Sequence, residues 1–225
     1  DAMESLGDEY GQVDTERLRL LEPDIVVVPS YLEGQYWGID DALVDEVEDA
    51  APVVALSIPG RDMRGMAERI EELAATLGVD VEGEPATAAR TAFDDSEESL
   101  RQAFADHPDV SFMAASGTAE SLYVAVPSGY ADLTTYQALG MDIVEPDTDE
   151  THWQQLSWEE IDRYRADVIL GDSRGGRVDQ ILELIPPAAR DIADLDVDQL
   201  ARWEAVFAPG WANMARIMDD LTEVV

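Results

Sequence analysis

Apolar runs of strand length, each preceded by a capped helical segment, constrain this chain more than any other feature of its sequence. The run Asp24–Val28 has the pattern of a buried strand and follows a predicted helix, Asp14–Leu21, whose cap is Asp14. The run Val53–Ser57 follows a second predicted helix, Ile39–Asp49. Strands that alternate with helices favour an α/β fold with mostly parallel sheets. No apolar run approaches the ~18 residues that span a bilayer.

The rest of the chain continues this alternation. Helical spacing of apolar residues, with Ser, Asp, Pro or Gly at the ends, delimits the remaining elements. We predict helices over Met63–Leu77, Pro85–Phe104, Leu133–Leu139, Ser157–Tyr164, Val178–Leu184, Asp198–Ala205 and Trp211–Thr222, and strands over Val110–Ala115, Ser121–Val126 and Asp167–Leu170.

A self-match indicates two related halves. Val13–Ser30 aligns without gaps on Leu156–Ser173, with Asp14 and Ser157 matched as helix caps. Any capped helix before a buried strand would look similar, so a chance match is the alternative. A true repeat predicts two lobes, with the long helical stretch after residue 83 as their connector. Ligands of such proteins lie between the lobes, at the carboxyl ends of the strands.

The charge balance excludes several partners. The 225 residues carry 50 Asp and Glu against 14 cations, all of them Arg, which gives a net charge of −36. Such a field repels nucleic acids and anionic membrane surfaces. A high-salt habitat with a GC-rich genome explains this composition, and so does a surface that attracts cations or basic docking partners.

Few residues support catalysis or direct metal binding. The chain has no Cys, which excludes thiolate nucleophiles and Cys-based metal sites. It contains no phosphate-binding glycine motif, since neither G-x-G-x-x-G nor a glycine loop followed by Lys occurs. Of the two histidines, His107 and His152, only His152 lies in an acidic stretch, which we interpret as a solvated loop. We therefore expect no catalytic residue, no metal site and no cofactor.

An ordered set of segments runs through nearly the whole chain. It comprises Leu21–Val28 (LEPDIVVV), Ala51–Leu56 (APVVAL), Met66–Gly78, Ser128–Leu133, Leu139–Gly140, Trp153–Ile161 and Ala166–Leu170. Each segment is weakly specific alone, but their order and spacing resemble ferric-siderophore and cobalamin binding proteins. These are the class III substrate-binding proteins of ABC importers.

The resemblance implies two α/β lobes joined by a single long helix, with the ligand in the cleft between them. We assign 1–83 to the N-terminal lobe, 84–106 to the connecting helix and 107–225 to the C-terminal lobe. The family's first lobe opens with a strand that precedes the segment at Leu6, so we expect this lobe to lack its N-terminal strand. The resemblance also implies a monomeric, extracytoplasmic lipoprotein whose anchoring Cys lies upstream, and which delivers its ligand to a permease.

Aromatic side chains after the first predicted strand are candidates for ligand contact. Tyr31, Tyr36 and Trp37 cluster there without core periodicity, which is typical of a binding wall. The alternative is a loop that packs on its own hydrophobic side chains. In the second half, Ser116 and Tyr130 lie in predicted turns after strands, and we add both to the site.

Trp153 and Arg174 complete the predicted ligand-binding residues. Trp153 precedes a predicted helix, and Arg174 lies in the glycine-rich loop after the last predicted strand. By the resemblance, Arg174 donates hydrogen bonds to anionic oxygens around a chelated metal; the alternative is an ion pair with a nearby carboxylate. Trp203 has helical spacing to Phe207, so we assign it to the core.

The resemblance also implies docking of each lobe on the permease through an acidic residue. In the second lobe the matching carboxylate is Glu159, and in the first it is Asp40 or Asp41.

The expected ligand is a ferric siderophore, with iron present only inside the chelate. Hydroxamate or mixed chelators are favoured over tricatecholates, because Arg174 and Arg177 are the few cations at hand. The alternatives are the same fold with haem or a cobalamin as ligand, an α/β enzyme acting on a small polar substrate, and a surface domain that binds no ligand.

Overall fold

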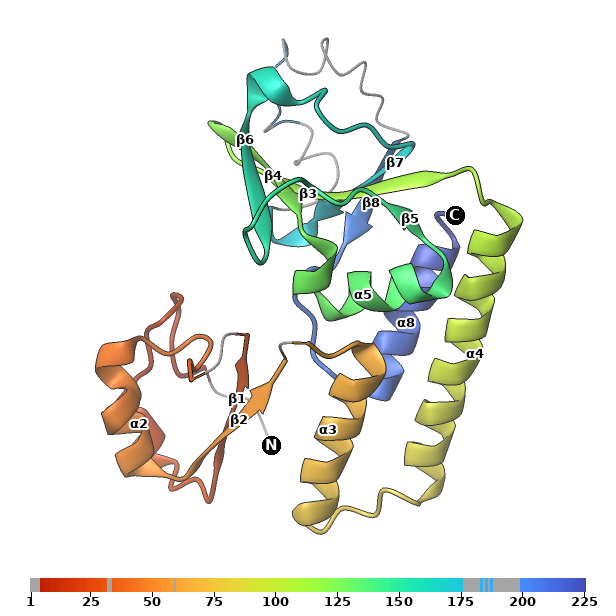
Figure 1. Ribbon diagram of the computed structural model, residues 1–225. Helices are drawn as coiled ribbons and strands as arrows, with labels where there is room; N and C mark the ends of the chain where they lie inside the picture. Colours follow the sequence, from red (N-terminus) through yellow and green to blue (C-terminus); the bar gives the residue numbers. More distant parts are fainter. Residues whose placement is uncertain are drawn as a thin grey trace. The chain divides into compact units, whose positions relative to one another are not determined.

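The computed structural model describes residues 5–31, 34–58, 60–175, 183, 185, 187 and 199–225 (Figure 1). The chain divides into two compact units, Asp1–Pro59 (unit 1) and Gly60–Val225 (unit 2). Both combine helices with parallel strands, so the predicted α/β class is confirmed. Within the described ranges, no helix is long and apolar enough to cross a membrane.

Unit 1 is built on two parallel strands that pair along their full length. Its elements are α1 (Thr15–Leu20), β1 (Val26–Ser30), the 3-10 helix η1 (Asp41–Leu43), α2 (Val44–Ala50) and β2 (Val53–Ser57). Helix α1 begins at the predicted cap, because the Asp14 carboxylate accepts the Arg17 N–H at 2.9 Å. Leu18 of α1 and Val47 of α2 are buried, which fixes the apolar face of each helix.

Unit 2 contains a six-stranded sheet and four of the described α-helices. Its elements are α3 (Met63–Thr76), α4 (Glu84–Asp106), β3 (Ser111–Gly117), β4 (Ser121–Ala125), η2 (Pro127–Gly129), α5 (Ala131–Leu139), β5 (Asp142–Ile143), β6 (Trp153–Ser157), η3 (Trp158–Glu160), β7 (Val168–Asp172), η4 (Ser173–Gly175), β8 (Leu200–Trp203) and α8 (Trp211–Thr222).

The strand order in this sheet is β6-β4-β3-β7-β8, with β5 beside β3. β5 and β7 are parallel to β3, and β8 is parallel to β7. β4 is antiparallel to β3, since only three residues connect the two strands, and β6 is antiparallel to β4. The carboxyl ends of β3, β7 and β8 therefore meet at one edge of the sheet.

The two faces of the sheet are filled differently. Met113, Val124 and Leu156 belong to an apolar core on one face, together with Trp158. Phe112, whose side chain alternates with Met113, meets Phe104 of α4 edge-on at 5.8 Å. Figure 1 shows α5 and α8 next to the sheet on this second face, with α4 running alongside α8.

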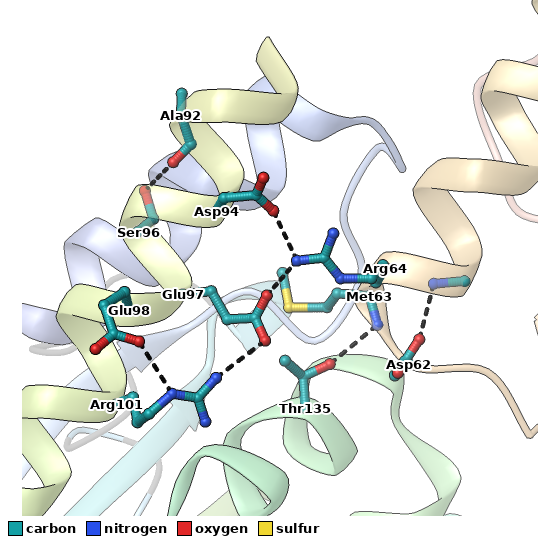
Figure 2. A network of polar contacts seen from close by, with 11 residues as sticks. Asp62, Met63, Arg64, Ala92, Asp94, Ser96, Glu97, Glu98, Arg101 and Thr135 are labelled. Atoms are coloured by element: carbon teal, nitrogen blue, oxygen red, sulfur yellow. Dashed lines mark hydrogen bonds and ion pairs between the residues drawn. The ribbon is translucent and has the colours of Figure 1, made fainter. Parts of the chain in front are cut away.

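Helix α3 is tied to three other helices of unit 2. Arg64 near its start forms an ion pair with Asp94 at 2.8 Å and a second with Glu97, both on α4 (Figure 2). The Met63 N–H donates to Thr135 Oγ1 of α5 at 3.0 Å. Trp211 of α8 donates its indole N–H to Glu71 at 2.7 Å. These contacts place α3 in unit 2.

Two predicted helices are wrong. The segment predicted as a helix over Ser157–Tyr164 contains only the single turn η3, and it follows a strand, β6, that we did not predict. The segment predicted as a helix over Asp198–Ala205 contains β8. In both places pairing with a distant strand outweighs helical spacing. The helix predicted over Val178–Leu184 lies outside the described residues apart from position 183.

The two copies of the self-match share a cap and a strand. Asp14 and Ser157 both occupy N-cap positions, and the aligned strands β1 and β7 both lie in parallel pairs. The helices differ, because α1 has six residues and η3 has three. Helix α4 covers the predicted connector, 84–106; its role as a connector, and the lobe boundary at residue 83, remain predictions.

Candidate functional site

An aromatic cluster lies on the α5 side of the sheet in unit 2. It consists of Tyr130, Trp153 and Trp203, which we call the aromatic cluster. The Tyr130 ring centroid lies 5.4 Å from that of Trp153 and 5.0 Å from that of Trp203, and the two indoles are 5.8 Å apart. All three pairs meet edge-on, the geometry that aromatic quadrupoles favour.

Three different elements bring these rings together. Tyr130 is the N-cap residue of α5, Trp153 opens β6, and Trp203 ends β8. Side chains alternate along a strand, so Trp153 lies on the opposite face from Leu156, which packs in the core described above. Tyr130 and Trp153 were predicted as site residues, and Trp203 was assigned to the core. Trp203 is 3% exposed, so its burial is confirmed, although its segment is a strand and not the predicted helix.

A buried carboxylate holds Trp203 in place. Asp132, in the first turn of α5, is 1% exposed and accepts the Trp203 indole N–H at 2.6 Å. Burial raises the pKa of Asp132 to about 6, although the hydrogen bonds from Trp203 and from the α5 backbone oppose the rise. The position of Trp203 therefore depends on a group with almost no access to water.

The Tyr130 hydroxyl remains protonated. Burial raises its pKa, Arg174 lowers it, and Asp172 and Asp132 raise it further. The phenol is therefore a neutral hydrogen-bond donor beside a hydrophobic surface. His152 lies next to it, with ring centroids 5.6 Å apart, and burial lowers the pKa of this imidazole.

Arg174 projects from the carboxyl end of β7. Its guanidinium holds the Asp172 carboxylate in a fork, with Nη2–Oδ2 at 2.6 Å and Nε–Oδ2 at 2.9 Å. The Asp172 residue is 3% exposed, whereas the Arg174 side chain is 47% exposed. The ion pair that we weighed as an alternative for Arg174 is thus present, yet about half of the Arg174 side chain remains exposed. Arg177 lies outside the described residues.

Ser116 lies near the end of β3, opposite Tyr123 of β4. The Tyr123 ring is 6.4 Å from Trp153, so this strand pair borders the aromatic cluster. Ser116 also lines a separate hollow on the other face of the sheet, beside Met113 and Trp158. Of the predicted site residues within the described ranges, it alone lines that hollow.

Unit 1 has its own aromatic group, in and near the loop after β1. Trp37 lies between Tyr31 and Tyr10, with ring centroids at 4.8 Å and 5.1 Å. The Tyr36 hydroxyl instead donates to Glu48 of α2 at 2.7 Å, and this hydrogen bond raises the pKa of the phenol. Tyr10 was missed because it precedes α1 and belongs to no predicted strand-end loop.

The three predicted docking carboxylates are exposed. Asp40 is the N-cap of η1 and accepts the Ala42 N–H at 2.9 Å, and Asp41 is the first residue of that turn. Glu159 is in η3. No group of three or more His, Asp or Glu side chains in the described part of the chain could hold a metal ion.

Comparisons with known proteins agree on one family. The family model described as "Periplasmic binding protein" matches residues 6–190. None of the curated proteins matches the chain significantly. The structure of DesE, a ferric-siderophore receptor protein from Streptomyces coelicolor, is 28% identical with a TM-score of 0.89, and the match covers 97% of this chain and 75% of DesE.

Two more distant structures share the fold. FhuD2 from Staphylococcus aureus with bound ferrioxamine B is 16% identical with a TM-score of 0.63, and the match covers 94% of this chain and 79% of FhuD2. The iron uptake ABC transporter substrate-binding protein PiuA from Streptococcus pneumoniae is 19% identical with a TM-score of 0.63, and the match covers 96% of this chain and 76% of PiuA.

Proposed function

Because the chain belongs to the periplasmic binding protein family, we propose that it captures a ferric siderophore and delivers it to the permease of an ABC importer. The likeness to DesE, a ferric-siderophore receptor protein, supports this ligand class. The likeness to PiuA supports a role in iron uptake by an ABC transporter. The family supports an extracytoplasmic location and a binding rather than a catalytic role.

The observation that carries the proposal is the aromatic cluster next to Arg174. A ferric siderophore presents aliphatic or aromatic linkers around a polar, oxygen-rich chelate. Aromatic rings bury the linkers with little loss of side-chain entropy, and Tyr130 and Arg174 donate hydrogen bonds to the chelate oxygens. The chelator already fills the coordination shell of the iron, so no metal ligand is needed from the protein.

We assign the ligand-binding residues accordingly. In unit 2 they are Ser116, Tyr130, Trp153 and Arg174. The buried Trp203 ring packs against Tyr130 and Trp153 and positions them. In unit 1 we propose Tyr31, Tyr36 and Trp37. The Trp37 ring is 40% exposed, which leaves it accessible to a ligand. Tyr36 requires its hydroxyl to leave Glu48 or its ring edge to serve as the contact.

The permease-docking carboxylates are proposed as Asp40 or Asp41 in unit 1 and Glu159 in unit 2. Their exposure suits contact with a basic partner surface. The remaining parts of the proposal are that the protein works as a monomer and that a lipid anchor holds it at the membrane.

A tryptophan-fluorescence titration tests the ligand class. The panel consists of ferric hydroxamate, ferric catecholate and mixed-type siderophores, haem and cobalamin. We expect quenching at micromolar or lower concentration by a ferric siderophore, and at least tenfold weaker binding by Tyr130→Ala and Arg174→Ala. Tight binding of haem or cobalamin alone would replace the proposed ligand. No response to any member would refute ligand capture by this chain.

A further inference from the structure

We infer that the site selects ferric chelates of zero or positive net charge and discriminates against anionic ones, because Asp172 neutralises the cation that would otherwise attract anions. This inference rests on the proposed function and names the ligand class of the same site. The selected property is the net charge of the chelate, so the preference holds across chelator chemistries.

The charges around Tyr130 are unbalanced toward the negative. Among the described residues, the groups that act electrostatically on its hydroxyl are Arg174, Asp172 and Asp132. That is one cation against two carboxylates. Asp172 is fixed under Arg174 by three side-chain hydrogen bonds and by accepting the Arg174 backbone N–H at 3.0 Å. A ligand that reaches Arg174 therefore meets a paired guanidinium.

The other charged or titratable groups near the cluster add no positive charge. Burial lowers the pKa of the His152 imidazole, which favours its neutral form. Glu204, directly after Trp203, is paired with Arg202 at 3.2 Å and with Arg216 at 2.8 Å, and Arg216 is also paired with Asp220 at 2.5 Å. Two cations therefore meet two carboxylates, and this group adds no net positive charge.

Unit 1 is more acidic still. Residues 1–59 contain 15 Asp and Glu but two Arg, and both of these, Arg17 and Arg19, are in α1. Residues 31–40 of the sequence contain Glu33 and Asp40 and no cation. Two cations of unit 2, Arg61 and Arg177, follow β2 and β7 in the sequence. Each has an Asp within two residues, namely Asp62 and Asp179.

A matched series of chelates tests this selection. Ferrioxamine B carries one positive charge on its pendant amine, its N-acetyl derivative is neutral, and its N-succinyl derivative carries one negative charge. The ferric tris-hydroxamate centre is the same in all three. At about 50 mM salt, we expect the dissociation constant to rise roughly fivefold with each step from positive to negative. Equal affinities, or tightest binding of the succinyl derivative, would overturn the inference.

Two variants separate the local pair from the general acidity of the chain. Asp172→Asn and Asp109→Asn each remove one negative charge. Asp109 is exposed in the turn before β3, whereas Asp172 is the last residue of β7. Because β3 and β7 are parallel, the two residues lie at opposite edges of the sheet. We expect Asp172→Asn to abolish or invert the preference, and Asp109→Asn to keep it within about twofold. Equal effects of the two variants would overturn the assignment to Asp172.

The outcomes distinguish this inference from the proposed function. If none of the three chelates binds the wild-type chain, the proposed function fails. If all three bind with the same affinity, ferric-siderophore capture stands and charge selection fails. The wild-type series decides this point even if Asp172→Asn does not fold, which circular dichroism of the variant would reveal.

Discussion

The indole N–H of Trp203 donates to a carboxylate that water hardly reaches. Asp132 is fully buried in the first turn of α5, where the helix dipole and the indole compensate part of its charge. The remaining cost of burial raises the pKa of this carboxyl from 3.8 to about 6. Folding therefore favours the protonated acid.

The sign of the resulting pH dependence follows from proton uptake. Between about pH 4 and pH 6 the folded state binds the Asp132 proton and the unfolded state releases it, so this group stabilises the fold as pH falls. The difference in unfolding free energy between wild type and Asp132→Asn should rise by up to roughly 3 kcal/mol from pH 7 to pH 4. Urea denaturation at several pH values measures it. A difference that is flat, or that shrinks on acidification, would contradict a buried ionised carboxyl.

The same residue should matter for ligand capture. Asp132→Ala removes the acceptor and leaves the indole N–H of Trp203 without this partner, whereas Asp132→Asn keeps an acceptor oxygen. We expect Asp132→Ala to bind a ferric siderophore at least about tenfold more weakly, and Asp132→Asn to lie within about threefold of wild type. Fluorescence titration of the folded variants measures both. Equal losses would show that the indole contact does not position the site.

The sequence allowed only part of the candidate site to be predicted. Tyr130, Trp153 and Arg174 could be predicted, because each is an aromatic residue or a rare cation next to a predicted strand or turn. Trp203 and Asp132 could not, since they lie 71 residues apart and only the fold joins them. A local sequence pattern can predict the helix or strand in which a residue lies. The hydrogen-bond partner of that residue depends on which distant elements pack together.

At the scale of the elements, predictions succeeded where apolar periodicity is strong and failed in the short strands of the sheet. β2 and α8 run from the predicted first to the predicted last residue. β6 begins Trp-Gln-Gln, which has no β-branched residue, and its strand conformation comes from pairing with β4. β8 likewise depends on pairing with β7, from Ile169 opposite Leu200 onward.

Helix α3 belongs to unit 2 through Arg64. Its guanidinium bridges two carboxylates of α4 and lies 4.8 Å from the centre of the Phe93 ring. Such a bridge combines charge-assisted hydrogen bonds with a cation–π contact. The start of α3, directly after the boundary between the two units, is thus held from two sides.

Removing this bridge should loosen α3. We expect Arg64→Ala to lower the unfolding free energy by about 1–2 kcal/mol. The matched control is Arg69→Ala on the same helix, whose Arg69–Glu72 pair is exposed and lies within α3, so its loss should cost less than about 0.5 kcal/mol. Denaturation followed by tryptophan fluorescence compares the two. Equal losses would mean that the bridge adds nothing beyond a surface ion pair.

For the whole molecule, the net charge of −36 is the dominant physical property. Like charges repel one another most when the chain is compact, and salt screens this repulsion. We therefore expect the Tm to rise when NaCl is increased from about 10 mM to about 1 M, where the Debye length falls to about 3 Å. Scanning calorimetry with NaCl and choline chloride at equal ionic strength checks this. A Tm that falls with both salts would contradict net repulsion in the folded state.

Calorimetric titration with ferrioxamine B and with its iron-free chelator tests most directly whether this chain captures a ferric chelate. The aromatic cluster and Arg174 are expected to recognise the compact chelate that iron creates, not the metal itself. The predicted result is one ferric complex per chain with micromolar or tighter affinity, and at least about tenfold weaker binding of the iron-free chelator, which must pay the entropy of folding around the site. Equal binding of both forms, or of neither, would contradict this function.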